Sequence, residues 1–370
     1  MSTIQARIAV IGAGWWATTA QIPAVLEHPN AVLAALCDRD AEKLTTAAAA
    51  YEIITTYTDL QTMLDQEALD GAIIVTNHAS HYAIAQRCLE HGLHIVVEKP
   101  FTLYAADAKA LLDLAQAQGR EIIIGYPYNY TAYAVRCREV LQSGELGAVQ
   151  YVSAVFGSHI FDLLRGEHDV TGPVHGPGKV YSDPALSGGG MGHLQMTHPL
   201  GLLFFITELP IRRVHALMSS HGLAVDLVNA FAVEFENGAL GSIGGTGNLG
   251  GGNGRKQDLQ IYCEHGSIDI DICTGHCTIY RRDQEPEHVE PVVGERDYRR
   301  NAPAHNLIEL ILGQRPNESP AVVGWQVVEL LDAAYRSAQQ GGSAVDRQSL
   351  YEARSYSRLP NHQYQRTSDQ

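Results

Sequence analysis

A glycine-rich turn near the start of the chain constrains the fold more than any other feature. The apolar run of residues 8–11 leads directly into Gly12, and Gly14 and Ala17 follow at the spacing of a turn that joins a strand to a helix. Gly12 permits the tight turn, Gly14 lets another molecule approach the backbone, and the small Ala17 lets the helix lie close to the strand. The free N–H groups at the start of such a helix attract an anion such as a pyrophosphate.

Short apolar runs alternate with helical patterns over the first third of the chain. We expect strands at residues 8–11, 32–37, 71–75, 94–97 and 121–124, and helices at residues 23–27, 41–51, 59–64, 81–91 and 104–118. Strands and helices in alternation build a parallel, doubly wound sheet. The sequence therefore predicts an α/β Rossmann domain over residues 1–125 that binds a dinucleotide.

The pattern changes after Gly125, where longer strands follow one another with fewer helices between them. We expect a helix at 134–142, strands at 149–156, 213–218, 229–235, 240–243, 259–263 and 267–272, and helices at 198–206, 304–312 and 321–338 that cover one face of the sheet. Near-consecutive strands favour antiparallel pairing. Residues 126–370 are therefore predicted to form an α+β domain with a large, mostly antiparallel sheet that binds the substrate.

The composition narrows the partners and the compartment. A net charge of −15 disfavours nucleic acid and anionic membranes as partners. No apolar run approaches the ~20 residues of a membrane span, and the polar N-terminus lacks a signal-peptide pattern, so we expect a cytoplasmic protein with reduced thiols. Cys273, His276 and Cys277 lie close together, but no second ligand pair at zinc spacing accompanies them, and we expect no metal.

Asp38 follows the second expected strand, at the ~20-residue distance that is typical of a dinucleotide-binding fold. A carboxylate at this place accepts hydrogen bonds from the ribose hydroxyls and repels a 2′-phosphate, which favours NAD over NADP. Arg39 next to it leaves NADP open. The alternative reading is a glycine turn with an exposed Asp that binds nothing.

Two further motifs contain residues that can bind a hydroxyl group or accept its proton. Lys99 lies in Glu98-Lys99-Pro100, directly after the fourth expected strand, where ligands of a parallel sheet bind. There it can hydrogen-bond a substrate hydroxyl; the alternative is a surface Lys before a turn. Gln195 and His198 are three residues apart, so they share a helix face, and His198 can accept a proton from an alcohol. We interpret His193 as a structural residue.

These motifs together resemble the glucose–fructose oxidoreductase, inositol dehydrogenase and rhizopine-catabolism family (Gfo/Idh/MocA) over nearly the whole chain. The resemblance rests on the Gly12–Ala17 turn, Asp38, the segment TNHASHY at 76–82, Glu98-Lys99-Pro100, the segment GELG at 144–147, and the Gly188-Gly189-Gly190 stretch that leads to His198. It implies NAD(P) chemistry on sugars, inositols or related polyols, and a homodimer or homotetramer formed through the C-terminal sheet. Lys99 and His198 match the active-site Lys and His of the family, and His81 matches a residue of the cofactor crevice.

The resemblance and the motifs give the full set of expected cofactor residues: Gly12, Gly14, Trp15, Trp16, Ala17, Asp38, Arg39, Thr76, Asn77, His81, Glu98, Lys99 and Pro100. The chain also departs from the family. Leu194 stands four residues before His198, where the family often has Asp, and Pro127 and Asn129 replace residues that are commonly Asn and Arg. These departures leave the substrate and the proton relay open.

The leading hypothesis is an oxidoreductase that acts on a secondary hydroxyl of a sugar or polyol, with Lys99, His198 and Gln195 as catalytic residues. One alternative is a redox-neutral, NAD-dependent glycoside hydrolase that oxidises the sugar 3-hydroxyl transiently and eliminates the glycosidic bond. Another is a non-catalytic NAD-binding sensor. Candidate substrate contacts are Tyr126, Tyr128, His159, Arg165, His168, His175 and Tyr181.

Overall fold

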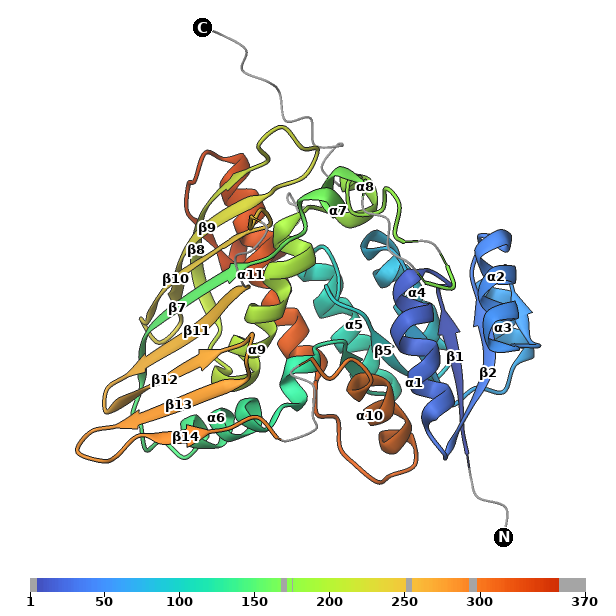
Figure 1. Ribbon diagram of the computed structural model, residues 1–370, viewed down its shortest axis with the longest axis horizontal. Helices are drawn as coiled ribbons and strands as arrows, with labels where there is room; N and C mark the ends of the chain where they lie inside the picture. The colour runs from blue at the N-terminus through green and yellow to red at the C-terminus, as the bar shows by residue number, and fades with distance from the viewer. Residues whose placement is uncertain (1–4, 168–171, 175, 251–254, 293–297, 353–370) are drawn as a thin grey trace, which may run out of the picture.

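Two sheets form the frame of the protein in a computed structural model, which describes residues 5–167, 172–174, 176–250, 255–292 and 298–352. A six-stranded sheet lies at the right of Figure 1 and a nine-stranded sheet at the left, with helices between them. The predicted fold class, a parallel Rossmann sheet followed by a large, mostly antiparallel sheet, is confirmed. None of the helices among the described residues is long and apolar enough to cross a membrane.

The first sheet is parallel throughout, with the strand order β3-β2-β1-β4-β5-β6. Its strands are β1 (Ala6–Ile11), β2 (Ala31–Cys37), β3 (Thr56–Tyr57), β4 (Gly71–Ile74), β5 (His94–Val97) and β6 (Ile122–Ile124). The order reverses beside β1, because β2 lies on one side of it and β4 on the other. A crevice for a ligand opens at such a switch point, outside the carboxyl ends of the strands.

The helices of this half end where the sequence provides a cap. The side chain of Asp40 accepts hydrogen bonds from Glu42 N and Lys43 N at the start of α2, and Gly119 ends α5 in a left-handed conformation. The helical elements are the π-helical turn η1 (Ala17–Gln21), α1 (Ile22–Glu27), α2 (Ala41–Tyr51), α3 (Leu60–Gln66), the 3₁₀ turn η2 (His78–Ser80), α4 (His81–Glu90) and α5 (Ala105–Gln118). The predicted helices of the first third are confirmed to within two residues at most ends.

The second sheet has the order β14-β13-β12-β11-β7-β10-β9-β8-β15, and only its central pair β7 and β10 runs parallel. Its strands are β7 (Val149–Gly157), β8 (Ile211–Ser219), β9 (Val228–Phe235), β10 (Leu240–Thr246), β11 (Lys256–Cys263), β12 (Gly266–Asp271), β13 (His276–Arg281), β14 (Glu287–Val289) and β15 (Val345–Asp346). The strands β3, β13, β14 and β15 were not expected from the sequence, because they are short or carry many polar residues.

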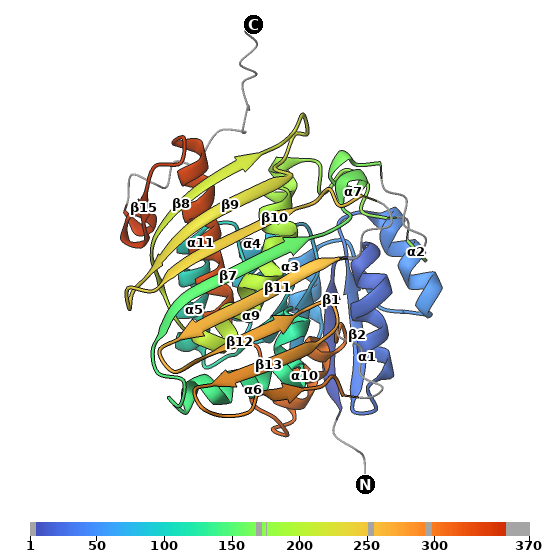
Figure 2. The same cartoon turned by 60° about the vertical axis from the view of Figure 1, so that its left-hand side comes forward.

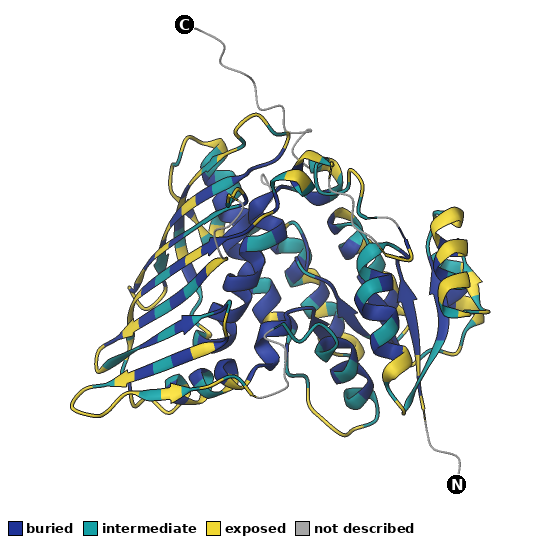
Figure 3. Ribbon diagram, in the orientation of Figure 1, coloured by how far each residue is buried: buried dark blue, intermediate teal, exposed yellow. Residues whose placement is uncertain are grey.

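Helices cover the inner face of the second sheet, and its outer face is open (Figure 2). Buried and exposed residues alternate along its strands in Figure 3, and the exposed set includes Tyr151, Val155, Leu217, Leu240, Tyr262 and Tyr280. The rings of Tyr151 and Tyr262 lie 6.0 Å apart across β7 and β11. The homodimer or homotetramer expected through this sheet stays a prediction.

The inner layer is built from α6 (Ala132–Gln142), α9 (Thr197–Thr207) and α11 (Ala321–Gln339), joined by the short elements η3 (Pro127–Tyr130), α7 (Phe161–Arg165), α8 (Pro184–Ser187) and η5 (Arg347–Tyr351). The helix α11 contacts β8 on one side and α5 on the other, so it links the two halves.

One predicted helix position is wrong. We expected α10 (Ala302–Ile311) to cover the second sheet, but its Leu307 and Ile308 belong to the core of the first sheet, with Ile73 and Val96. Gly71 on β4 has no side chain where Ile311 approaches it. The amphipathic pattern of α10 indicated an apolar face but not which sheet that face contacts. The division at residue 125 stays a prediction, since the chain returns to the first sheet through α10.

The glycine stretch before α9 is explained by close packing. A Cβ on Gly190 would lie 2.0 Å from the carbonyl oxygen of Asp226, and a Cβ on Gly189 would lie 2.1 Å from the hydroxyl of Tyr335. The Asp226 carboxylate accepts hydrogen bonds from Gly190 N (2.7 Å), Gly192 N (2.8 Å) and the Tyr335 hydroxyl (2.7 Å). This buried carboxylate therefore fixes the start of the helical segment that carries His198.

Gly190→Ala should lower the free energy of unfolding by about 1–3 kcal/mol, because the added methyl group must displace the backbone at Asp226. Urea denaturation followed by circular dichroism measures this loss. Gly250→Ala is the matched control, since a Cβ there meets no atom within 4 Å. Equal stability of the two variants would contradict the packing described for Gly190.

Candidate active site

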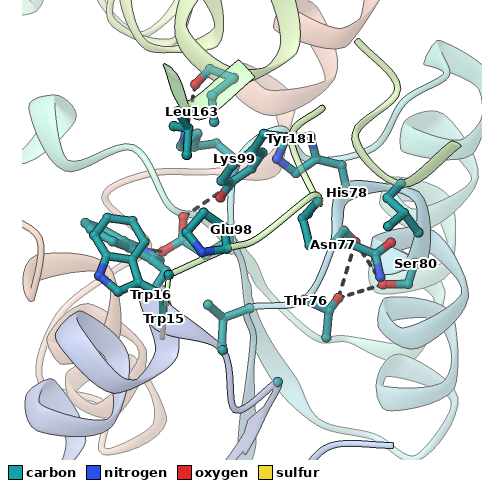
Figure 4. Close-up of a pocket in the computed structure, with 18 of the residues that line it drawn as sticks. Trp15, Trp16, Thr76, Asn77, His78, Ser80, Glu98, Lys99, Leu163 and Tyr181 are labelled. Carbon is teal, nitrogen blue, oxygen red and sulfur yellow. Dashed lines mark hydrogen bonds between the residues drawn. The ribbon is translucent and has the colours of Figure 1, made fainter. Parts of the chain in front are cut away.

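A cavity of about 1290 Å³ lies between the carboxyl ends of the first sheet and the inner layer of the second half. Gly12, Gly14 and Asp38 line one end, and Tyr128, Phe156 and His198 line the other. Lys99 lies on the wall between them (Figure 4). The cavity is therefore long enough to reach from the glycine turn to the expected catalytic residues.

The glycine turn has the conformation that its sequence predicts. Gly12 has a φ of 109°, and a Cβ there would lie 2.4 Å from Val75 O, so a larger residue is excluded both by conformation and by contact. A Cβ on Gly14 would meet no atom within 4 Å, which leaves its backbone open to the cavity. Ala17 is fully buried beneath the turn and does not line the cavity.

Asp38 is held at the cavity wall by two backbone groups. Its Oδ2 accepts from Ala13 N at 2.7 Å and its Oδ1 accepts from Asp40 N at 2.8 Å. Each carboxylate oxygen has a second lone pair. The fixed carboxylate can therefore accept two hydroxyl groups as well, and the donor set at this end of the cavity fits the ribose of a dinucleotide. Arg39 lines the same end.

Thr76 and Asn77 line the cavity after β4, and Ser80 completes a local network. Thr76 Oγ1 and Ser80 Oγ lie 2.8 Å apart, and Ser80 Oγ donates to Asn77 O (Figure 4). His81 is fully buried behind this wall, with its Nδ1 2.8 Å from Pro100 O. His81 and Pro100 support the wall from behind and do not line the cavity, which places them outside direct contact with a ligand.

Glu98 joins the first helical turn to β5. It is buried, and its Oε1 accepts from Trp16 Nε1 at 2.7 Å and from Gln21 Nε2 at 2.6 Å. Figure 4 shows it beside Trp16 on the cavity wall. Burial raises the pKa of this carboxyl group, while Lys99 and the two hydrogen bonds oppose that rise.

Lys99 donates from Nζ to the carbonyl oxygen of Leu194 at 3.0 Å. Leu194 lies in the π-helical turn η4 (Gly192–Met196), and Pro199 follows in α9 without an N–H to donate back into that turn. A carbonyl of the turn is thus left for another donor. Burial lowers the pKa of Lys99 to about 8, against a smaller opposing effect of Glu98.

His198 lies in an aromatic enclosure at the far end of the cavity. Its ring centroid is 5.7 Å from Tyr298, 6.0 Å from Tyr128 and 6.3 Å from Phe156. The side chain is 6% exposed, and its Nδ1 has no hydrogen-bond partner. Burial, followed by the charge of Lys99, holds the pKa of His198 well below its ordinary value of 6.5. His198 is therefore neutral at physiological pH.

Gln195 also lines the cavity, as its three-residue spacing from His198 suggested. His193 does not line it. Its ring stacks on Tyr335, with centroids 4.4 Å apart and planes 9° from parallel, which matches the structural role expected for this residue.

The expected substrate residues divide into three groups. Tyr128, His159 and Tyr181 line the cavity. Tyr126 is buried elsewhere, with its hydroxyl 3.0 Å from Thr197 Oγ1, and Arg165 pairs with Glu167 at the end of α7; neither lines the cavity. His168 and His175 lie outside the described residues.

Several lining residues were missed from the sequence. These are Tyr298, which contacts both His198 and Trp16, together with His78, Ser158, Arg255, Gln257 and Arg300. The sequence offered one sign of these lining residues, which is a polar residue such as Gln257 at a strand position that faces inward. Cys277, weighed above as a metal ligand, lies with its Sγ 3.2 Å from that of Cys137, and the described residues contain no cluster of three His, Cys, Asp or Glu suited to a metal.

Comparison with known families agrees with this geometry. Residues 6–126 match the GFO_IDH_MocA model, described as an oxidoreductase family with an NAD-binding Rossmann fold, and residues 134–269 match the GFO/IDH/MocA C-terminal domain. The chain belongs to the Gfo/Idh/MocA family of oxidoreductases. The predicted resemblance is thereby confirmed, as is the assignment of NAD as the cofactor of this fold.

Curated relatives are distant and match over part of their length. The uncharacterized oxidoreductase YdgJ of Escherichia coli is 29% identical over 43% of this chain and 44% of its own length. D-apiose dehydrogenase of Paraburkholderia graminis is 28% identical over 43% of this chain and 42% of its own length. A dTDP-3,4-didehydro-2,6-dideoxy-α-D-glucose 3-reductase of Streptomyces antibioticus is 25% identical over 60% of this chain and 74% of its own length. The matches to the first two relatives thus span less than half of those proteins.

Solved structures share the whole fold. The aldose–aldose oxidoreductase of Caulobacter crescentus has a TM-score of 0.75 at 23% identity and covers 92% of this chain and 99% of its own. An inositol dehydrogenase homolog from Azotobacter vinelandii, solved with NAD⁺, has a TM-score of 0.77 at 20% identity and covers 92% and 97%. At sequence identities of 20% and 23%, these similarities show a shared fold and no more.

Proposed function

We propose that this protein is an NAD-dependent dehydrogenase that oxidises a secondary hydroxyl of a sugar, a sugar derivative or a polyol. One observation carries the proposal. A single cavity connects the Gly12 and Asp38 end, which suits a dinucleotide, with Lys99 and a neutral His198. A non-catalytic sensor would need only the first of these two ends.

The cofactor end uses groups that the fold has already fixed. The open backbone at Gly14 suits the pyrophosphate, the Asp38 carboxylate suits the ribose hydroxyls, and Thr76 and Asn77 form the adjoining wall. NAD, when bound, supplies the acceptor for the hydride that leaves the substrate carbon. The Asp38 carboxylate disfavours a second phosphate at the same ribose.

The protein's own residues then handle the proton and the developing charge. His198 is neutral, so it can accept the proton of the hydroxyl group; its Nδ1 is buried, which leaves Nε2 to face the substrate. The Lys99 ammonium can donate a hydrogen bond to the same oxygen and stabilise negative charge there as the proton leaves. Gln195, on the same helical segment, can orient a neighbouring hydroxyl.

The printed activities of relatives support a carbohydrate substrate. D-apiose dehydrogenase and the dTDP-sugar 3-reductase act on sugars, and a structural neighbour is a levoglucosan dehydrogenase solved with NADH and levoglucosan. These activities belong to those proteins, and they narrow the first panel of substrates to test on this one.

The direct test incubates the protein with NAD, a panel of aldoses, sugar acids and inositols, and a matched panel of aryl glycosides. We expect NADH to accumulate in proportion to ketone or lactone product with at least one free sugar or polyol. Release of the aryl group with catalytic NAD, and without net NADH, would contradict the proposal and favour the redox-neutral glycosidase.

Lys99→Met and His198→Asn should each reduce kcat by about 100-fold or more, because each removes a group that acts on the reacting oxygen. NADH binding, followed by fluorescence titration, should change little in either variant. His193→Phe is the matched control: it keeps a ring stacked on Tyr335 and should retain most of the activity. A larger loss in His193→Phe than in His198→Asn would contradict these roles.

NAD should bind at least tenfold more tightly than NADP, since the Asp38 carboxylate would lie beside the 2′-phosphate of NADP. Isothermal titration with each dinucleotide measures the ratio. Asp38→Ser should remove most of the preference by removing the charge. Equal affinities in the unmodified protein would show that Arg39, and not Asp38, sets the cofactor preference.

A further inference from the structure

The charges on the cavity walls are distributed unevenly between the two halves of the chain. The carboxylates that line the cavity are Asp38, Asp40, Asp59 and Glu98, and all of them come from the first half. Among the described lining residues after position 126 there is no Asp or Glu, although the chain carries 41 acidic residues against 26 basic ones. The same walls carry Arg255 and Arg300. Among the described residues, the part of the cavity lining that comes from the second half of the chain is thus cationic, although the chain as a whole is acidic.

Arg255 directly precedes the strand β11, is exposed, and lines the cavity together with Gln257 two residues later. Gln257 is directly opposite Phe156 in the pairing of β11 with β7, and the Phe156 ring is stacked at 21° on His198. Gln257 is 4% exposed, and its Oε1 is buried without a hydrogen-bond partner. This amide oxygen is closed off from the open cavity, so Gln257 contributes to the wall, and the charge beside it comes from Arg255.

Arg300 reaches the cavity from the other wall. It follows Tyr298 by two residues, and the Tyr298 ring contacts His198 at 5.7 Å and Trp16 at 6.2 Å. Within the described part of the chain, neither Arg255 nor Arg300 forms an ion pair. Other cations of the same half of the chain form ion pairs: Lys256 pairs with Asp258, and Arg281 pairs with Glu145 and Glu287. Among the described residues, no carboxylate forms an ion pair with either cavity arginine, so an anionic ligand can take that place.

We infer that the substrate is an anionic sugar, whose carboxylate or phosphate group is bound by Arg255 and Arg300. This inference rests on the proposed function and names its substrate class. Arginine suits the role because its planar guanidinium matches two oxygens of a carboxylate or phosphate at once. A neutral sugar would leave both charges without a partner.

Paired ligands of equal stereochemistry test the inference by binding alone. The probes are D-glucuronate against D-glucose, D-galacturonate against D-galactose, and D-glucose 6-phosphate, each titrated into the NADH-loaded protein by calorimetry and by the fluorescence of its Trp residues. We expect at least one acid or phosphate to bind about tenfold or more tightly than its neutral partner, as charge-assisted hydrogen bonds require. The stronger of the two anionic forms identifies the group. Equal affinities in every pair, or no binding of any anion, would overturn the inference.

Charge variants assign the preference to the arginines. Arg255→Gln and Arg300→Gln should each reduce the affinity for the preferred anion by about tenfold and leave the affinity for the neutral partner within about twofold. Lys256→Gln is the matched control, because it removes the same charge from the neighbouring residue, which is outside the cavity lining. Loss of NADH affinity in Arg300→Gln with unchanged anion affinity would overturn the role of Arg300. An anion preference without any dehydrogenase activity would support this inference while contradicting the proposed function.

Discussion

The hydrogen bond from Lys99 Nζ to Leu194 O is the contact on which the site depends. Lys99 comes from the loop after β5 of the first sheet, and Leu194 comes from the π-helical turn that starts the His198 helix. The bond therefore joins the two halves at the cavity wall, where the charge of Lys99 contributes to lowering the pKa of His198. Leu194 stands where the family often has an Asp, so this position provides a backbone carbonyl to Lys99 but no carboxylate. That substitution is consistent with a Lys whose pKa burial lowers to about 8 and with a His whose pKa stays well below 6.5.

The surrounding contacts hold this bond in place from several directions. Glu98 ties the loop of Lys99 to the first helical turn through Trp16 and Gln21. On the opposite side, the buried Asp226 carboxylate fixes Gly190 and Gly192, and thereby the turn that contains Leu194. Both carboxylates are engaged in structural hydrogen bonds, one in each half of the chain. The cations that line the second half of the cavity are Arg255 and Arg300.

Much of the first half could be predicted from the sequence, because its glycine turn, helix caps and short apolar strands are local patterns. Lys99, Gln195 and His198 could likewise be chosen from motif and spacing, and all three line the cavity. The predictions that were wrong concerned features that depend on contacts between segments distant in the sequence. The apolar stripe of α10 could not indicate its sheet, and Tyr126 and Arg165 have suitable chemistry but lie in the core and on the surface. Tyr298, Arg255 and Gln257 carry no motif, since only the pairing of β11 with β7 and the path of the chain after β14 bring them to His198.

The central claim is that burial and Lys99 together keep His198 neutral, so that it can act as a base beside a charged donor. The measurement that tests it most directly is a pH titration of the ¹⁵N-labelled imidazole of His198 by NMR, assigned by comparison with His198→Asn. We expect the pKa of His198 to lie well below 6.5 in the unmodified protein and to shift upward in Lys99→Met, because a nearby positive charge disfavours the imidazolium ion. A transition near pH 6.5 that is the same in both proteins would contradict the account.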